Sequence, residues 1–429
     1  MPGMSDVVIV TRAGVGDGSW AERLVCHPRL PLVAALDAVR PAVHVWDCSA
    51  GRLDRLATIG AHSDPYGEVG AWDRDTPSVA WHPTEAALAV THEGRVRQWV
   101  HRLADDAPHA GDGTEVRAMH HVPDFDYQHL AFSPDGDALW AWPAHNTTNA
   151  WDRSDTIDLR SGTVRSGRAW DTGIVEHPGG GLVATYNSDQ GATLVLFART
   201  DLASGPLRFL RRALIIDVDG YEAPVFSSDG RRFAIRGNAY EETLSVYEFP
   251  TLRLMLFTTL GDDEPDRLSS ATGEGADVAD WSRHNIAFDA RPGVLWIGRP
   301  DGTLLELNLD EETVTPHPLL GGAPVTALGR LVTGDLVAAT ATGEVVLVAV
   351  AGGPHIPDRE AMVEVVRTFV DSTSEVPDDD QDLERHLVLA DGERSWDQDD
   401  LDSVTEASSA DPTWLQVQAA VNKMRADGR

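Results

Sequence analysis

Histidine and carboxylate side chains, the groups that bind metal ions and transfer protons, are concentrated between residues 120 and 129. The sequence there is HHVPDFDYQH, and its spacing matches no metal-binding motif. Residues 62–64 contain the histidine, serine and aspartate of a hydrolytic triad, but neighbours in sequence do not form one, and no Gly-x-Ser-x-Gly motif is present. The phosphate-binding motif needs a lysine after its last glycine, and the only lysine is Lys423. We therefore expect no catalytic residue, no metal site and no cofactor.

A second pattern places an aromatic residue beside a carboxylate at six points along the chain. Aromatic faces and carboxylates together attract arginine and lysine side chains, through cation–π contacts and ion pairs. The alternative is structural, with the aromatic rings filling gaps between sheets and the acids capping turns. The predicted partner-binding residues are Trp20, Tyr66, Trp72, Asp73, Phe125, Asp126, Tyr127, Trp170, Asp171, Tyr221, Glu222, Asp280 and Trp281.

The elements that must position these residues are β-hairpins. The clearest one is LAFSPDGDALWAW, residues 130–142, in which two apolar strands flank a Pro-Asp-Gly turn. Proline fixes φ near −65° and the following Asp-Gly tolerates the turn, so the chain reverses for a local reason. Each aromatic and acidic segment comes shortly before such a hairpin. The turns lie at Pro28, Pro83, Pro134, Pro178, Ser228 and about Pro292.

These turns are separated by 55, 51, 44, 50 and 64 residues, by subtraction. Several short strands repeated at about 40–50 residues predict a β-propeller. We expect an all-β fold with seven blades, six or eight being the alternatives, at about 23–60, 78–120, 128–167, 173–216, 223–260, 285–320 and 323–351. The last repeat offers only three strands, so we expect residues 6–13 to complete it by pairing with residues 345–349.

The third strand of the first repeat ends in Val43-His44-Val45-Trp46-Asp47, and this ending resembles the WD40 repeat. Weaker counterparts end at Val100, Phe197, Glu248 and Leu307. The resemblance covers roughly 350 residues, although no blade begins with Gly-His. It implies a degenerate WD40-like propeller in which the aromatic and acidic segments connect successive blades on the top face.

The composition changes after residue 353. Residues 354–429 contain 19 acidic and 7 basic residues, whereas residues 1–353 form the predicted propeller. Apolar spacing predicts one helix over 357–370 and another over 411–427, with Asp411 as N-cap and Pro412 at N1. These helices either dock on the propeller or bind a partner. The acidic segments 376–382 and 397–402 are expected to stay exposed.

The net charge of −33 argues against nucleic acid and anionic membrane partners. The first ten residues lack a secretory signal, and two cysteines cannot form a disulfide framework, so a cytoplasmic location is expected. The near absence of lysine is typical of a GC-rich, and so bacterial, genome.

These features together predict a non-catalytic scaffold that binds a basic protein or peptide on its top face. The alternative is a propeller enzyme, such as a metal-dependent lactonase or a sugar-cleaving enzyme, with carboxylates around the central channel. The sequence leaves the oligomeric state open.

Overall fold

The computed structural model describes residues 7–16, 18–67, 74–101, 114–145, 147, 149–189, 191–200, 205–261, 281–350, 358–377, 383–409 and 411–427. Strands form 46% of the chain and helices 12%, which confirms the predicted all-β class. Within the described residues the strands make seven small sheets, and each predicted repeat corresponds to one of them.

The sheets from the first, second, third and sixth repeats each have four antiparallel strands in chain order, as does the sheet of the fifth repeat described below. Their strands are β2 (Ala21–Cys26), β3 (Leu32–Asp37), β4 (Val43–Asp47) and β5 (Asp54–Ile59); β6 (Val79–Trp81), β7 (Ala87–His92), β8 (Arg95–His101) and β9 (Thr114–Ala118); β10 (His129–Phe132), β11 (Ala138–Trp142), β12 (Arg153–Asp158) and β13 (Val164–Arg168); β23 (Ile286–Phe288), β24 (Val294–Gly298), β25 (Thr303–Asn308) and β26 (Thr313–Pro318).

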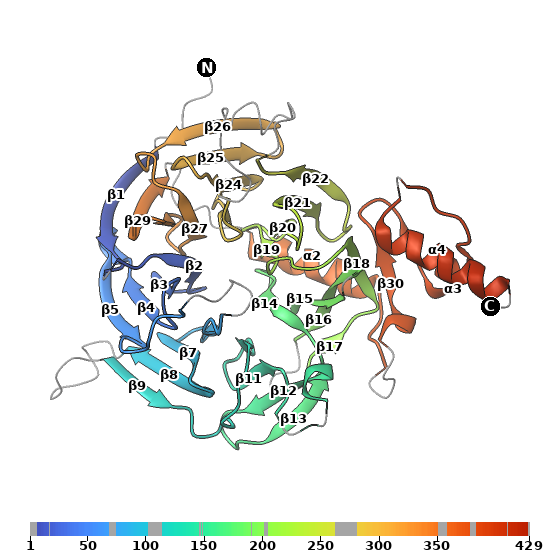
Figure 1. The fold of residues 1–429 in the computed structure, drawn as a ribbon, viewed down its shortest axis with the longest axis horizontal. Helices are drawn as coiled ribbons and strands as arrows, with labels where there is room; N and C mark the ends of the chain where they lie inside the picture. The colour runs from blue at the N-terminus through green and yellow to red at the C-terminus, as the bar shows by residue number, and fades with distance from the viewer. Residues whose placement is uncertain are drawn as a thin grey trace. The chain divides into compact units, whose positions relative to one another are not determined.

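A fifth sheet joins distant parts of the chain. Strand β1 (Val7–Gly14) pairs with β29 (Glu344–Val350), and Figure 1 shows the two side by side. The sheet continues from β29 to β28 (Leu336–Thr340) and β27 (Val325–Arg330). Ala13 lies opposite Val345 and Val8 opposite Ala349, so these two strands pair as the sequence predicts. This pairing covers an edge of β29 that would otherwise be open.

The described chain divides into two compact units. Unit 1 contains these five sheets, and unit 2 contains residues 168–202, 206–259 and 358–429. The residues after 357 therefore group with the fourth and fifth repeats.

Unit 2 contains two sheets, one of them enlarged by the C-terminal residues. The strands from the fourth and fifth repeats are β14 (Asp171–Glu176), β15 (Leu182–Asp189), β16 (Ala192–Arg199), β17 (Arg208–Phe209) and β18 (Arg212–Asp217); β19 (Val225–Phe226), β20 (Arg232–Arg236), β21 (Thr243–Glu248) and β22 (Leu254–Thr259). Strand β30 (Val388–Ala390) adds to β18 in parallel, and β31 (Ser395–Trp396) pairs with β30.

The hairpin turns are held by their own side chains. In the third repeat, Ser133 Oγ donates to Asp135 Oδ1 at 2.6 Å and accepts from the backbone N–H of Ala138 at 2.9 Å. Gly136 has φ of +76°, and a Cβ there would lie 2.0 Å from His82 Nε2. The turn therefore needs glycine for its backbone and for its closeness to the preceding hairpin.

Histidines that precede proline in the first and fourth hairpins join one hairpin to the next. His27 Nδ1 accepts from the N–H of Arg29, so its Nε2 donates to the carbonyl of Glu85 at 2.8 Å. His177 repeats this arrangement, accepting from the N–H of Gly179 and donating to the carbonyl of Gly230. The hairpins that defined the repeats thus also connect neighbouring sheets.

Helix α2 (Arg359–Asp371) packs into the core of unit 2. Of the two alternatives for the C-terminal helices, docking within the chain therefore applies to α2. Asp358 caps it, and its face of Met362, Val365, Val366 and Phe369 is buried. Phe369 packs within 4.8 Å of the rings of Phe197 and Phe249, measured between centroids. The apolar spacing of the sequence placed this helix within two residues of its bounds.

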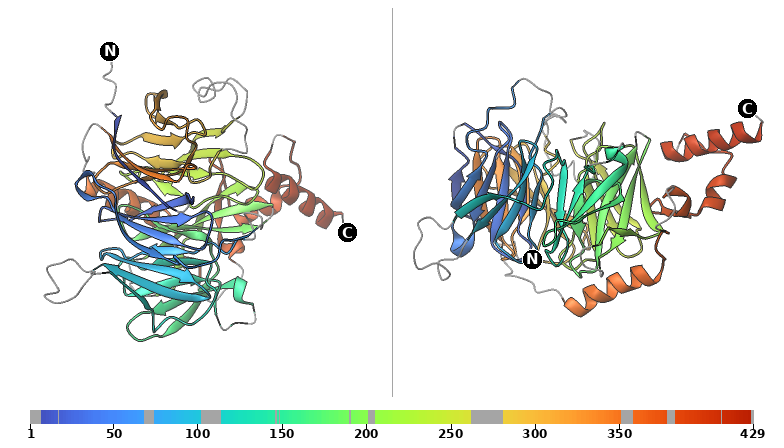
Figure 2. Two further views of the ribbon diagram at one scale, coloured as in Figure 1. Left: turned by 60° about the vertical axis from the view of Figure 1, so that its left-hand side comes forward. Right: turned by 90° about the horizontal axis from the view of Figure 1, so that it is seen from below.

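Helices α3 (Gln398–Ser403) and α4 (Thr413–Ala426) form a pair that Figure 2 shows apart from α2. Asn422 of α4 donates to the carbonyls of Leu401 and Val404. The N-cap of α4 is Pro412 and not Asp411, and Pro412 provides no side-chain cap. Asp217 of β18 accepts from the N–H groups of Thr413 and Trp414 instead, which fixes α4 to the sheet.

Candidate functional site

Four of the seven predicted aromatic residues that the structure describes are buried. Tyr127, Trp170, Tyr221 and Trp281 are all inside the protein, whereas Trp20, Tyr66 and Phe125 are partly exposed. The buried rings are unavailable to a partner in this structure. Trp72, Asp73 and Asp280 lie outside the described residues.

Several polar groups in or near these segments bond to residues in the second or third strand of the adjoining sheet. Tyr127 Oη donates to Asp155 at 2.8 Å, and Asp171 Oδ2 accepts from the N–H of Ser188 at 2.9 Å. Ser19 donates to Asp37 in the first sheet in the same way. Hydrogen bonds of this kind belong to the structural alternative, in which these residues support the fold. Glu222 is partly buried.

Tyr66 already has a cation over its ring. The guanidinium of Arg74 lies 5.8 Å from the ring centroid and 3.9 Å from the carboxylate of Glu22. Burial, reinforced by the negative charge of Glu22, raises the pKa of Tyr66. The chain's own arginine therefore makes the contact that was predicted for a partner.

Two acidic segments approach each other in unit 1. Burial raises the pKa of Asp75, and the charge of Asp126 raises it further. Asp126 is exposed, whereas Asp124 is paired with Arg95 at 3.3 Å. The charge of Asp126 that acts on Asp75 in this way also favours a positive charge placed near the two residues.

Aromatic residues gather at one end of the third sheet, at the start of β10 and the end of β11. We call this group the aromatic end, and Asp126 lies in the segment that leads into it. Because β10 and β11 are antiparallel, with His129 opposite Trp142, the segment before β10 and the β11–β12 connection meet there. The aromatic end consists of Phe125, Tyr127, His129, Trp142, His145 and Trp151.

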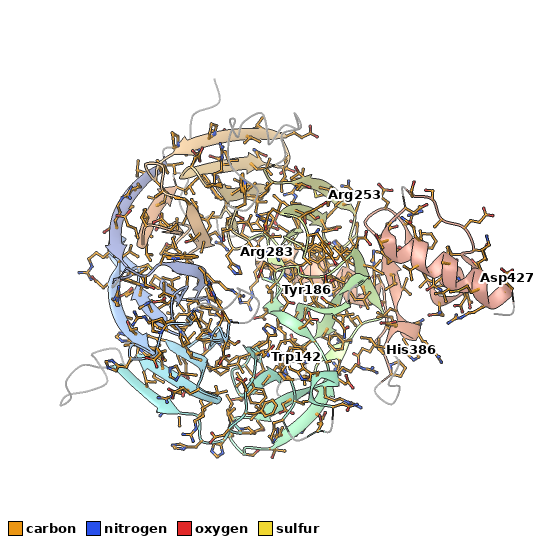
Figure 3. The ribbon with its side chains drawn as sticks, in the orientation of Figure 1. Trp142, Tyr186, Arg253, Arg283, His386 and Asp427 are labelled. Carbon is orange, nitrogen blue, oxygen red and sulfur yellow. The ribbon has the colours of Figure 1, made fainter. Side chains whose placement is uncertain are left out.

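Trp142 is fixed between two other rings. It stacks on His129 with centroids 5.7 Å apart, and its Nε1 donates to the carbonyl of Trp151 at 3.1 Å. The rings of Trp142 and Trp151 meet edge to face at 4.9 Å. Trp151 is 56% exposed, and Figure 3 marks Trp142. A fixed tryptophan pair with one exposed member offers a π-face at little entropic cost.

His145 is fixed by a buried carboxylate. Asp155 Oδ2 accepts from the backbone N–H of His145 at 2.9 Å and pairs with its Nδ1 at 2.7 Å. With Nδ1 as the donor, neutral His145 presents Nε2 as an acceptor. The ring of Phe125 contacts that of His145 at 6.4 Å. The aromatic end can therefore hold a cation over its rings and accept a hydrogen bond at His145 Nε2.

The sequence pattern found Phe125, Asp126 and Tyr127 but missed the other four residues. His129, Trp142, His145 and Trp151 lie outside the connections between sheets to which the pattern was confined. The available signal was the irregular third repeat, where a ten-residue connection, 143–152, replaces a tight turn and contains Trp151-Asp152.

The histidine-rich stretch 120–129 does not form a cluster. His120 and His121 are exposed, whereas His129 stacks on Trp142. Across the described ranges, no group of three or more His, Cys, Asp or Glu side chains is placed to hold a metal ion. Ser63 Oγ bonds to His92 Nε2 at 2.9 Å, while its neighbours His62 and Asp64 are exposed.

Comparison with known proteins gives no family for this chain. No protein-family model matches it, and no curated protein matches it. Among the helices that the structure describes, none has the length and apolar character needed to cross a membrane.

Proposed function

We propose that this chain is a WD40-like β-propeller that acts as a non-catalytic module and binds a protein segment with basic residues at the aromatic end. The propeller assignment is supported by seven repeats that each form one sheet and by the pairing of β1 with β29. The Trp-Asp ending of β4 supports the WD40 resemblance.

One observation carries the choice of site. Trp151 exposes its ring while Trp142 is held in place beside it, and Asp126 in the neighbouring segment is exposed and electrostatically coupled to Asp75. A guanidinium or ammonium group over an exposed tryptophan gains about 0.5–1 kcal/mol, and more when water is excluded. The net charge of −33 adds long-range attraction for a basic segment.

The test uses a fluorescein-labelled Gly-Arg-Gly-Arg-Gly peptide as the probe and fluorescence anisotropy as the measurement. We expect Trp151→Ala combined with Asp126→Asn to weaken binding about tenfold or more, equal to a loss of about 1.4 kcal/mol. A peptide with glutamate in place of arginine should not bind, because its charge is repelled.

The matched control is Tyr240→Ala combined with Asp54→Asn. Tyr240 is 75% exposed and Asp54 is exposed, and neither belongs to the third sheet, so the control also removes one exposed aromatic ring and one negative charge. An equal loss in both double variants would show attraction to net charge alone and would contradict the proposed site. Circular dichroism checks that both variants fold.

A further inference from the structure

A short segment of unit 2 lies along the edge formed by β17 and β18. It consists of Ser374–Pro377, between α2 and β30, and we call it the Glu375 segment. The N–H of Arg211 donates to the carbonyl of Ser374 at 2.8 Å, and the N–H of Val376 donates to the carbonyl of Phe209 at 2.8 Å. Leu210 and Glu375 lie opposite each other in an antiparallel bridge. The segment therefore adds to the sheet edge as an extra strand would.

The side chain of Glu375 is held by two arginines from different strands. Its two carboxylate oxygens lie 3.3 Å from Arg199 Nη1 and 3.1 Å from Arg208 Nη1. All three side chains are only 25–34% exposed, so the charges are partly shielded from water. Interactions of this kind are stronger than ion pairs on an open surface.

The flanking residues complete the contact. Val376, next to Glu375, is buried, which differs from the exposure expected for the segment that begins with it. Arg168 donates to the carbonyl of Pro377 at 2.7 Å. Arg168, Arg199 and Arg208, together with the backbone of Phe209–Arg211, form what we call the arginine edge. It contacts the backbone, a carboxylate and an apolar side chain, the three elements by which a sheet edge recognises an extended peptide.

The rest of the C-terminal region does not depend on this segment for its attachment. On one side Phe369 is buried in the core, and on the other β30 pairs with β18, where Arg211 Nε also donates to the carbonyl of His386, marked in Figure 3. Protection of the sheet edge alone would need only backbone pairing. It would not need a carboxylate held by two arginines.

We propose that the arginine edge is a binding site for an extended acidic segment of another protein, and that the Glu375 segment occupies it within the chain. The external segment carries a carboxylate followed by a β-branched apolar residue, as Glu375-Val376 does. Because the internal segment is tethered on both sides, its effective concentration is about millimolar or higher, and it competes strongly. Binding of an external segment therefore requires that the internal one be weakened.

The experiment uses the full chain and a fluorescein-labelled peptide, Ser-Thr-Ser-Glu-Val-Pro, which copies residues 372–377. In the released variant, Glu375→Ala with Val376→Ser, the internal segment loses both side-chain contacts. We expect the peptide to bind the released variant at least about tenfold more tightly than the wild type. A peptide with glutamine in place of glutamate should not bind the released variant.

Two pairs of arginine substitutions distinguish binding at the arginine edge from a general attraction of the acidic peptide to positive charge. Adding Arg199→Gln and Arg208→Gln to the released variant should abolish binding. Adding Arg231→Gln and Arg253→Gln, two exposed arginines of the β19–β22 sheet, should not. If the released variant is folded by circular dichroism but binds no better than the wild type, the proposal is overturned. Equal loss with both arginine pairs overturns it as well.

If the released variant fails to fold, Glu375→Gln replaces it. This substitution preserves size and backbone pairing and removes only the charge. We expect peptide affinity to increase, by less than in the released variant. If affinity does not increase, the proposal is rejected. The result is independent of the aromatic end, since every residue involved belongs to unit 2.

Discussion

At the scale of single residues, the buried histidines between hairpins make stability depend on pH. His177 is fully buried, and its neutral form uses one ring nitrogen as acceptor and the other as donor. Burial lowers the pKa of His177 to about 4, even though its bond to Gly230 acts in the opposite direction. The protonated form could not accept the N–H of Gly179.

The sign of the pH effect follows from this lowered pKa. Between about pH 6.5 and pH 4 the unfolded chain binds a proton at His177 that the folded chain does not, so stability falls as the pH falls. We expect a loss of up to about 3 kcal/mol from this residue. Urea unfolding at about pH 7 and about pH 5 should show a smaller pH dependence for His177→Asn, in which Oδ1 can still accept the turn N–H.

The exposed His120 provides the control for this measurement. His120→Asn removes an exposed ring, so it should change the free energy of unfolding little at either pH. An unchanged slope in His177→Asn would show that His177 binds protons equally in the folded and the unfolded chain, which contradicts a lowered pKa in the folded state.

At the scale of elements, α2 contributes to the core of unit 2. Phe369 is fully buried against Phe197 and Phe249, whereas Val363 on the same helix is 37% exposed. We expect Phe369→Ala to lower the free energy of unfolding by about 3–5 kcal/mol through the cavity it leaves. Val363→Ala should cost about 1 kcal/mol or less, because it opens no cavity.

Hydrogen exchange and denaturant unfolding measure this difference. In Phe369→Ala the amides of β16 and β21, whose side chains pack in the same core, should lose protection. If their protection is unchanged, α2 is only a surface attachment and does not stabilise the sheets.

The sequence predicted those elements whose cause is local. The Pro-Asp-Gly hairpins are held by bonds within five residues, as at Ser133, and α2 has an apolar face that is visible in its own spacing. Strand β30 was missed because its partner β18 lies more than 170 residues earlier and nothing in its own residues indicates that pairing. The same holds for Asp217, which caps α4 from another element.

The candidate site was only partly predictable for a related reason. Residue type and spacing located Phe125, Asp126 and Tyr127, but they do not tell which rings are buried. Tyr127 is buried because Asp155 accepts its hydroxyl, and Asp155 lies beyond an irregular connection. The conformation of that connection, which brings Trp151 to Trp142, has no signature in the sequence.

At the scale of the whole molecule, the charge of −33 sets how salt acts. Repulsion among unpaired carboxylates destabilises the compact state, and salt screens it. We expect the melting temperature to rise as NaCl increases from about 0.05 to about 0.5 M, while binding of the Gly-Arg-Gly-Arg-Gly peptide weakens. Differential scanning calorimetry and anisotropy measure the two effects.

A melting temperature that rises with salt while peptide affinity falls would distinguish repulsion within the protein from attraction between the protein and the peptide. A melting temperature that falls with salt would show that ion pairs such as Arg291 with Glu306 outweigh the repulsion. Sodium chloride is used because strongly hydrated anions such as sulfate would stabilise the folded protein by a mechanism other than screening.

The ribosome synthesises β1 long before β29, the strand with which β1 pairs. Gly14 and Glu344 are opposite each other, yet about 330 residues separate them, a delay of roughly 17–66 s at about 5–20 residues per second. During that time Val7 and Ile9, which pack against the core in the finished unit, have no strand to cover them. Cotranslational folding of unit 1 therefore ends with its first strand, and a nascent chain arrested before residue 344 still has β1 available to aggregate or to bind a chaperone.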